Sequence, residues 1–321
     1  MGSMKSLRVG VIGVGYLGTH HARIYRALKG VELVGLCDTD LLKVRLARKF
    51  RTAFYPDHRS LFGQVDCVSI VVPTQGHFQI AKDFLEQGIH VLIEKPMTET
   101  LEEADALLKL AREHGLLIQV GHVERFNKAV ETMDAIFHSP RFIECHRLGP
   151  FRKRGTEVGV VLDLMIHDID IVLYLVKSPV ERIDAVGVNV LTPFTDIANV
   201  RINFKNGAVA NLTASRITRD FMRKIRIFGD NAYVSLDYMK QRANLYRKEN
   251  SAIRHQKITI PKEEPLRREL EAFASSVQKK EKPLVSGEDG REALRVALEV
   301  ERMIQERLTL ARQTLSPIPH S

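Results

Sequence analysis

Three glycines near the N-terminus have the spacing of a dinucleotide-binding turn. Gly13, Gly15 and Gly18 follow a short apolar run and precede a segment, 19–28, with helical periodicity. Gly13 permits a tight turn, Gly15 lets the backbone approach a pyrophosphate, and Gly18 lets the helix pack on the strand. The N-terminus of that helix offers unpaired N–H groups to the phosphates. This order of strand, turn and helix predicts a nucleotide site.

An acidic residue ends the next apolar run. Residues 31–37, VELVGLC, predict a second buried strand, and Asp38 follows it, 20 residues after Gly18. A carboxylate at this place accepts hydrogen bonds from the adenosine ribose hydroxyls and repels a 2′-phosphate. The pattern therefore favours NAD over NADP. The alternative is an aspartate that only caps the chain after a strand.

A lysine and a histidine are the candidates for proton chemistry. Lys95 stands between a strand-like run and Pro96, where regular structure stops. His167 lies in the apolar segment 160–176, four residues after Asp163. On a helix these two side chains share a face, so the carboxylate can orient the imidazole. A solvated loop lysine and a buried core histidine are the alternatives, and both stay open.

Alternating patterns over about 120 residues predict the scaffold that positions the first of these groups. Further strand-like runs at 65–72, 90–93 and 116–120 alternate with helical patterns at 41–50, 77–87 and 102–114. This alternation predicts a doubly wound parallel sheet with its ligand at the carboxyl ends of the strands. The segments at those ends should line one crevice: Pro73-Thr74, Glu94-Lys95-Pro96 and Gly121-His122.

The pattern changes after residue 125. A helical segment, a strand-like run at 141–148 and the apolar helix at 160–176 are followed by short β-rich runs from 182 to about 260. These runs predict an antiparallel sheet of about six strands, and two helical segments follow it. The fold class is therefore α/β: a Rossmann domain at 1–123 and an α+β domain at 124–321. A helix near the chain end can pack back on the first domain.

Composition narrows the function classes. The 321 residues carry a net charge of +9, yet the basic residues are scattered among 39 acids and form no nucleic-acid-binding motif. No apolar run reaches the roughly 18 residues of a membrane span, and no signal-peptide pattern is present, so we expect a cytoplasmic protein. Three widely spaced cysteines predict buried thiols rather than disulfides or metal ligands. An anionic small molecule is the simplest partner for the excess charge.

Taken together, these motifs resemble the Gfo/Idh/MocA oxidoreductases and occur in that family's order over nearly the whole chain. The resemblance implies that Lys95, Asp163 and His167 form the catalytic set. We expect no metal, because the sequence has no His/Cys/Asp cluster with ligand spacing. The resemblance also implies a homo-oligomer, a dimer or tetramer, formed through the C-terminal sheet. The implied NAD contacts are Gly13, Gly15, Tyr16, Leu17, Gly18, Asp38, Pro73, Thr74, His77, Glu94 and Lys95.

Within the family, segments 121–127 and 147–151 are most similar to members that oxidise the 3-hydroxyl of UDP-N-acetylglucosamine or related nucleotide sugars. Arg147 and the basic loop that follows, Arg152-Lys153-Arg154, could hold a diphosphate; a solvated loop is the alternative. Met165 departs from the family, which often has glycine there. The implied substrate contacts are Arg125, Asn127, Arg147, Arg152, Arg154, Asp163 and His167.

The chemistry that follows is oxidation of an alcohol. NAD accepts a hydride from the carbinol carbon, His167 removes the hydroxyl proton, and Lys95 stabilises the developing alkoxide. Two other functions stay open: a dehydrogenase of a free polyol or sugar, and a non-catalytic NAD-binding sensor or repressor. The basic loop counts against the first, and the complete proton-transfer set counts against the second.

Overall fold

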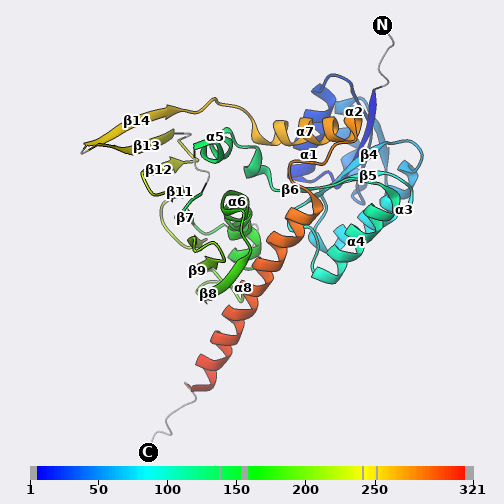
Figure 1. Cartoon of the computed structure of the whole chain (residues 1–321). Helices are drawn as coiled ribbons and strands as arrows, with labels where there is room; N and C mark the ends of the chain where they lie inside the picture. Colours follow the sequence, from blue (N-terminus) through cyan, green and yellow to red (C-terminus); the bar gives the residue numbers. More distant parts are fainter. Residues whose placement is uncertain (1–5, 137–138, 153–157, 241, 251, 315–321) are drawn as a thin grey trace, which may run out of the picture. The chain divides into compact units, whose positions relative to one another are not determined.

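The computed structural model describes residues 6–136, 139–152, 158–240, 242–250 and 252–314, which form two compact units. The first unit runs to Phe126 and takes in Glu264–Leu294, and the second consists of Asn127–Glu263 and the chain from Arg295 onward. Figure 1 labels most of their helices and strands. In the described chain, no helix is long and apolar enough to cross a membrane. The cofactor-binding and substrate-binding roles of the domains predicted at 1–123 and 124–321 stay predictions.

The first unit is built on a parallel sheet of six strands in the order β3-β2-β1-β4-β5-β6. The order reverses between β1 and β4, which creates a switch point where a ligand can bind. This sheet confirms the predicted Rossmann fold. Its strands are β1 (Leu7–Ile12), β2 (Val31–Cys37), β3 (Ala53–Tyr55), β4 (Cys67–Ile70), β5 (His90–Glu94) and β6 (Ile118–Gly121).

Helices cover this sheet because its strands are apolar on both faces. Helix α7 packs against α1, and its Leu270 and Phe273 are buried in the same core as Val9 and Val11 of β1. Helices α3 and α4 pack together. The helices are α1 (Tyr16–Ala27), α2 (Val44–Phe50), α3 (His77–Glu86), α4 (Leu101–His114), α7 (Pro265–Lys279) and the start of α8 (Gly287–Thr314).

The second unit contains an eight-stranded sheet in the order β14-β13-β12-β11-β7-β10-β9-β8. Strands β10 and β7 run parallel, and the other neighbours are antiparallel. The bounds are β7 (Phe142–Leu148), β8 (Val180–Val188), β9 (Ile197–Phe204), β10 (Val209–Ser215), β11 (Met222–Phe228), β12 (Ala232–Asp237), β13 (Arg242–Glu249) and β14 (Ala252–Thr259).

The sheet has eight strands where about six were expected, and the difference has a physical cause. Strand β7 joins the sheet from outside the β-rich region of the sequence, and its Arg147 is in register with Arg223 of β11. Strand β14 is exposed along nearly its whole length, so its sequence lacks the apolar alternation that marks a half-buried strand. Helix α5 (Lys128–Ile136), a π-helical turn (Val161–Met165), helix α6 (Ile166–Val176) and the part of α8 from Arg295 onward complete the unit.

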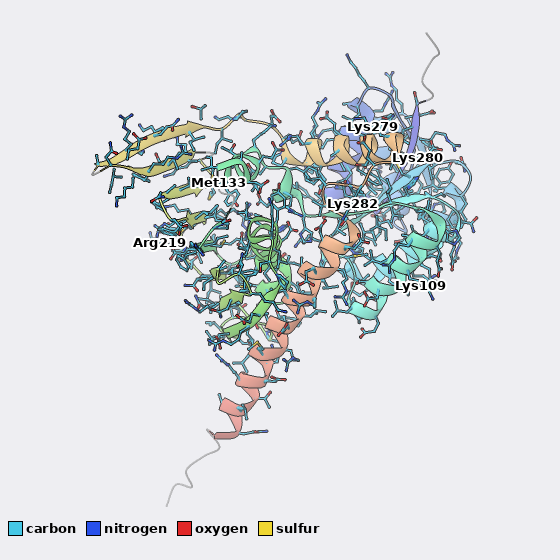
Figure 2. All side chains as sticks on the ribbon, viewed as in Figure 1. Lys109, Met133, Arg219, Lys279, Lys280 and Lys282 are labelled. Atoms are coloured by element: carbon cyan, nitrogen blue, oxygen red, sulfur yellow. The ribbon has the colours of Figure 1, made fainter. Side chains whose placement is uncertain are left out.

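Part of the positive charge lies on the surface of the first unit. Lys279, Lys280 and Lys282 are exposed around the C-terminal end of α7, and Lys109 is on α4 (Figure 2). A cavity opens at Gly13 and Gly15, and none of these lysines belongs to its wall. The net charge of +9 therefore does not by itself locate an anionic ligand. The geometry of each candidate site must do so.

Candidate functional site

The three glycines of the turn meet different surroundings. Gly13 has φ +85°, and a Cβ there would lie 2.6 Å from the carbonyl oxygen of Val71. A Cβ on Gly18 would lie 1.8 Å from the carbonyl oxygen of Gly13. A Cβ on Gly15 would meet no protein atom within 4 Å. The fold therefore requires glycine at 13 and 18, whereas Gly15 leaves open space where a pyrophosphate fits.

The Asp38 carboxylate is fixed by the turn. Its Oδ2 accepts the N–H of Val14 at 2.7 Å, and its Oδ1 accepts the N–H of Asp40 at 2.9 Å. A carboxylate oxygen can accept more than one hydrogen bond, so both oxygens keep capacity for ribose hydroxyls. The arrangement fits the adenosine ribose of a dinucleotide.

A cavity of about 660 Å³ opens at this turn. Four predicted cofactor contacts lie together in its wall: Gly13, Gly15, Asp38 and Pro73. The wall also contains Cys37, and burial raises the pKa of its thiol to about 12, so this cysteine is unreactive at neutral pH. Residues of the wall that sequence reasoning missed are Thr39, Pro56, Asp57, His58, Arg59, Gly76 and Ile80.

The missed loop, 56–59, is held against α3. His58 Nε2 lies 2.9 Å from Asp83 Oδ2, and Arg59 Nη2 lies 3.4 Å from the same oxygen. Although burial alone would raise it, hydrogen bonds from His58 and Gln79 lower the pKa of Asp83 below its usual range. The loop thus forms a fixed wall. Its sequence carries no periodic pattern that would reveal this role.

His77 ties two loops of the first unit together. The ring is buried, with Nδ1 3.0 Å from the carbonyl oxygen of Pro96 and Nε2 2.9 Å from that of Val72. Burial lowers the pKa of His77.

The wall of the cavity, as described above, does not include several predicted cofactor contacts, whose roles stay predictions: Tyr16, Leu17, Gly18, Thr74, His77, Glu94 and Lys95.

In the second unit, the predicted catalytic pair spans two kinds of helix. Asp163 lies in the π-helical turn, and His167 lies in the first turn of α6. Both side chains are half-buried. A π-helical turn interrupts regular α-helix and often marks a functional site. Met165, between them, is fully buried.

Arg147 is part of a buried ion pair. From β7, its Nε donates to Asp168 Oδ2 at 3.0 Å and its Nη2 donates to Oδ1 at 2.8 Å. The exposed fractions of the two side chains are 5% and 7%. The apolar segment 160–176 contains three aspartates, Asp163, Asp168 and Asp170, and this bidentate contact explains Asp168. The Asp168 carboxylate also balances the charge of Arg147, whose role as a substrate contact stays a prediction.

A second cavity, of about 140 Å³, lies beside Arg147 and Asp163. Arg152, predicted to bind substrate, stacks over the ring of Phe221 at 5.0 Å and is part of its wall. Arg216 and Arg223 also line it, and sequence reasoning missed both. Arg154 and its neighbour Lys153 lie outside the described residues.

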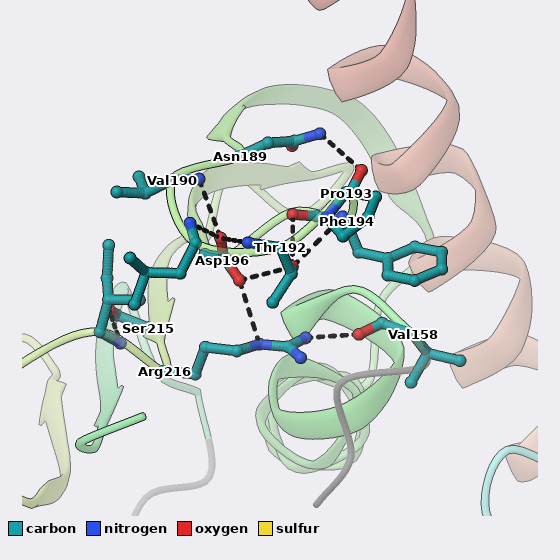
Figure 3. A network of polar contacts seen from close by, with 11 residues as sticks. Val158, Asn189, Val190, Thr192, Pro193, Phe194, Asp196, Ser215 and Arg216 are labelled. Carbon is teal, nitrogen blue, oxygen red and sulfur yellow. Dashed lines mark hydrogen bonds and ion pairs between the residues drawn. The ribbon is translucent and has the colours of Figure 1, made fainter. Parts of the chain in front are cut away.

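The guanidinium of Arg216 belongs to a polar network (Figure 3). The buried Asp196 carboxylate accepts the N–H groups of Val190, Leu191 and Thr192 at 2.6–2.9 Å. Arg216 Nε lies 3.7 Å from Asp196, and its Nη2 donates to the carbonyl of Val158. Burial alone would raise the pKa of Asp196, but these hydrogen bonds lower it. The network holds Arg216 at the wall of the cavity.

Two other predicted substrate contacts have local partners. Arg125 is buried, and its Nη2 lies 3.7 Å from Asp289 Oδ1. Asn127 Oδ1 accepts the N–H of Ala129 at 3.0 Å and so caps the start of α5. Their roles as substrate contacts stay predictions.

Two family models match the chain. Residues 7–122 match the oxidoreductase family with the NAD-binding Rossmann fold, and residues 129–235 match the GFO/IDH/MocA C-terminal domain. The chain belongs to the GFO/IDH/MocA oxidoreductase family. This finding confirms the family that the motifs resemble and confirms NAD as the cofactor.

The chain is similar to named enzymes over nearly its full length. It is 36% identical over 305 residues to the UDP-N-acetylglucosamine 3-dehydrogenase of Acidithiobacillus ferrooxidans, covering 92% of this chain and 97% of that protein. A solved structure of that enzyme matches with a TM-score of 0.91, covering 94% of this chain and 98% of the other. The myo-inositol 2-dehydrogenase of Thermotoga maritima is 24% identical over 325 residues, covering 94% and 97%.

Proposed function

We propose that this chain is an NAD-dependent dehydrogenase that oxidises a hydroxyl of a nucleotide sugar to a ketone, at C3 of UDP-N-acetylglucosamine or a close analogue. The observation that carries the proposal is the arginine-lined cavity beside Asp163. The similarity to the UDP-N-acetylglucosamine 3-dehydrogenase exceeds that to the inositol enzyme and supports the same conclusion.

The charge of the cavity wall favours an anionic substrate. Four arginines and one acidic residue, Asp163, line it. Asp168 balances Arg147, and Asp196 balances Arg216. Guanidinium groups outnumber carboxylates in this wall, which suits a diphosphate better than a neutral polyol. Phe221, which is 45% exposed, adds an aromatic surface on which a nucleobase could stack.

The proton chemistry is assigned to three side chains. His167 accepts the proton of the substrate hydroxyl, and Asp163, one turn away, orients the imidazole. Lys95 stabilises the alkoxide that develops as the proton leaves. NAD, when bound, supplies the hydride acceptor.

The proposed enzyme is a cytoplasmic homo-oligomer that uses the open face of the eight-stranded sheet. Aromatic rings stack across five neighbouring strands of this face with centroids 4.6–5.5 Å apart. Such a row suits a protein partner, and its members are Phe142, Phe228, Tyr233, Tyr246 and His255. The three cysteines are buried thiols, as suits a reducing compartment.

Direct turnover tests the substrate. The enzyme is incubated with NAD and UDP-N-acetylglucosamine, and NADH absorbance is followed with an aminotransferase added to remove the keto product. We expect NADH formation, and we expect UDP alone to compete with the sugar. No NADH from this sugar or its uronic acid, together with clear oxidation of a free polyol, would favour a polyol dehydrogenase. Binding of NAD without turnover of any sugar would favour a sensor.

An arginine variant links the cavity to the substrate. Arg152→Ala should raise KM for the nucleotide sugar far more than it lowers kcat, because it removes binding that is uniform along the reaction. Arg182→Ala is the matched control, since Arg182 is an exposed arginine of the same unit that pairs with Asp184 outside the cavity. Equal KM values for the two variants would remove this cavity from the substrate site.

A further inference from the structure

A buried carboxylate lies directly beside Lys95. Glu94 is the last residue of β5, and only 11% of its side chain is exposed. Its Oε1 lies 3.2 Å from Nε2 of His21, which is fully buried on α1. Burying a carboxylate away from water costs free energy unless it is paired. The contact with His21 places a polar ring nitrogen beside the carboxylate and links α1, the helix that follows the glycine turn, to the end of β5.

Gly121 makes room for this carboxylate. It is the last residue of β6 and is in register with Glu94. A Cβ on Gly121 would lie 2.8–2.9 Å from the carboxylate carbon and both oxygens of Glu94. The φ of Gly121 is not in the left-handed region, so conformational freedom does not explain the glycine. Space for the Glu94 side chain does.

The backbone around Lys95 is held on both sides. Glu94 Oε2 accepts the N–H of Lys95 at 3.3 Å. Beyond it, the carbonyl of Pro96 lies 3.0 Å from Nδ1 of His77. The Lys95 side chain therefore leaves a main chain whose two flanking residues are both fixed by buried polar groups.

The Glu94 carboxylate is one of several charged groups that act on His122, the residue after Gly121. Neighbouring His122 is fully buried, and burial, assisted by the positive charges of Arg125 and Lys95, lowers its pKa to about 3. The carboxylates of Glu94 and Asp289 oppose that shift. His122 is therefore neutral at physiological pH, and the groups whose charges act on it are Arg125, Lys95, Glu94 and Asp289.

We propose that Glu94, which contacts His21 and fits in the space left by Gly121, is a positioning residue for Lys95 and not a contact of the cofactor. The proposal rests on the proposed function in one respect, the assignment of Lys95 to catalysis. Glu94 acts by fixing the start of the Lys95 side chain, so displacing its carboxylate should misplace the ammonium group without changing the glycine turn. A misplacement of about 1 Å can cost about 100-fold in rate.

Two variants and one control test it. Glu94→Gln removes the charge at constant volume, and Gly121→Ala keeps Glu94 but pushes its carboxylate aside. Gly10→Ala is the matched control: it adds the same methyl group within the same sheet, where the nearest atoms are the side chains of Leu61 and Val68 at 3.1 and 3.2 Å. Circular dichroism confirms folding of each protein. Calorimetric titration gives the Kd for NAD, and mass spectrometry gives the rate at which an amine-reactive reagent labels Lys95 in the protein alone.

Glu94→Gln and Gly121→Ala should both lower kcat about 10- to 100-fold with an unchanged Kd for NAD. Both should also speed the labelling of Lys95, because a released side chain reaches solvent more often, whereas Gly10→Ala should change neither. A weaker Kd with unchanged kcat would make Glu94 a cofactor contact instead. Labelling rates equal to the control would overturn the proposal. If wild-type protein does not oxidise the nucleotide sugar, the proposed substrate fails, and the labelling rates still decide the positioning.

Discussion

The two candidate sites of this chain differ in what forms them: one depends on the main chain and the other on side chains. At the glycine turn of the first unit, the cavity wall depends on main-chain geometry: the φ of Gly13, the bare Cα of Gly15 and the N–H groups that hold Asp38. The cavity of the second unit depends on side chains, with four guanidinium groups around Asp163.

This difference decides how far each site can be anticipated and how each should respond to mutation. A turn made by consecutive residues carries its signature in their spacing, whereas a cluster made by side chains from several strands exists only once the strands have paired. Substitutions at the turn should therefore act through backbone geometry, and substitutions in the arginine cavity through charge.

The largest effect is expected on turnover, for which the proposed function gives roles to Lys95 and His167. Lys95→Met and His167→Ala should each lower kcat by about 100- to 10,000-fold, or about 3–5 kcal/mol of barrier. NAD affinity should survive, because neither residue belongs to the glycine turn. Steady-state kinetics and calorimetric titration of NAD make the test, with melting curves to confirm folding. A near-normal kcat in either variant would show that its residue has a different role.

The next largest effect separates structural from binding arginines in the second unit. Arg147→Met should lower the free energy of unfolding by about 3–5 kcal/mol, because it leaves Asp168 buried without its partner. The double variant Arg147→Met/Asp168→Leu should recover much of that loss. Urea denaturation measures both, with Arg152→Ala as the control that should stay near wild type. Equal stability of Arg147→Met and Arg152→Ala would mean that the buried pair contributes little.

The contrast between the sites also explains what the sequence could predict. Five of the six Rossmann strands, the glycine turn and Asp38 follow from local patterns, and the structure has them close to where the patterns placed them, whereas β3 was not predicted. Arg223 and Arg216 reach the second cavity through long-range pairing. Arg223 is in register with Arg147, and Ser215, next to Arg216, is in register with Leu148. Nothing in the local sequence around either arginine reveals these neighbours.

The same reasoning covers the other differences. Arg147 stays a predicted substrate contact, and its bond to Asp168 could not be predicted because it spans 21 positions and joins two elements. Strand β14 was missed because a strand exposed on both faces needs no apolar alternation. The loop 56–59 follows a strand of three residues, too short to give a periodic signal.

A pair of glycine variants sharpens the claim that the first site is built from backbone. Gly18→Ala should lower the free energy of unfolding by about 3 kcal/mol or more, since its Cβ cannot coexist with the Gly13 carbonyl without a shift. Gly15→Ala should leave stability unchanged and weaken NAD binding. Denaturation curves and NAD titration on both proteins give the comparison. Similar losses of stability in the two variants would contradict the different roles assigned to these glycines.

Buried His122 of the first unit should make the free energy of unfolding fall in acid. His122 has its pKa lowered to about 3 from 6.5, so below pH 6.5 the unfolded chain takes up a proton that the folded chain refuses. Stability linked to His122 is thus complete above that pH and is lost as the pH falls toward 3. At about pH 4.5 the loss should reach about 3 kcal/mol. His122→Asn should lose less stability between neutral pH and pH 4.5 than wild type, whereas the exposed-site control His114→Gln should follow wild type.

The smallest effect concerns Asp38, the one side chain on which cofactor choice should depend at the backbone-built site. Wild-type protein should bind NAD more tightly than NADP by about 1–3 kcal/mol, because the carboxylate accepts ribose hydroxyls and repels a 2′-phosphate. Asp38→Asn removes the charge but keeps the shape, so this preference should shrink mainly through better binding of NADP. Asp40→Asn removes an exposed charge two residues away and should leave the preference unchanged. Calorimetric titration of both cofactors against the three proteins measures it. If NADP bound wild type as well as NAD, or if the two variants behaved alike, the selectivity would come from elsewhere in the wall, where Asp57 and Arg59 also face the cavity.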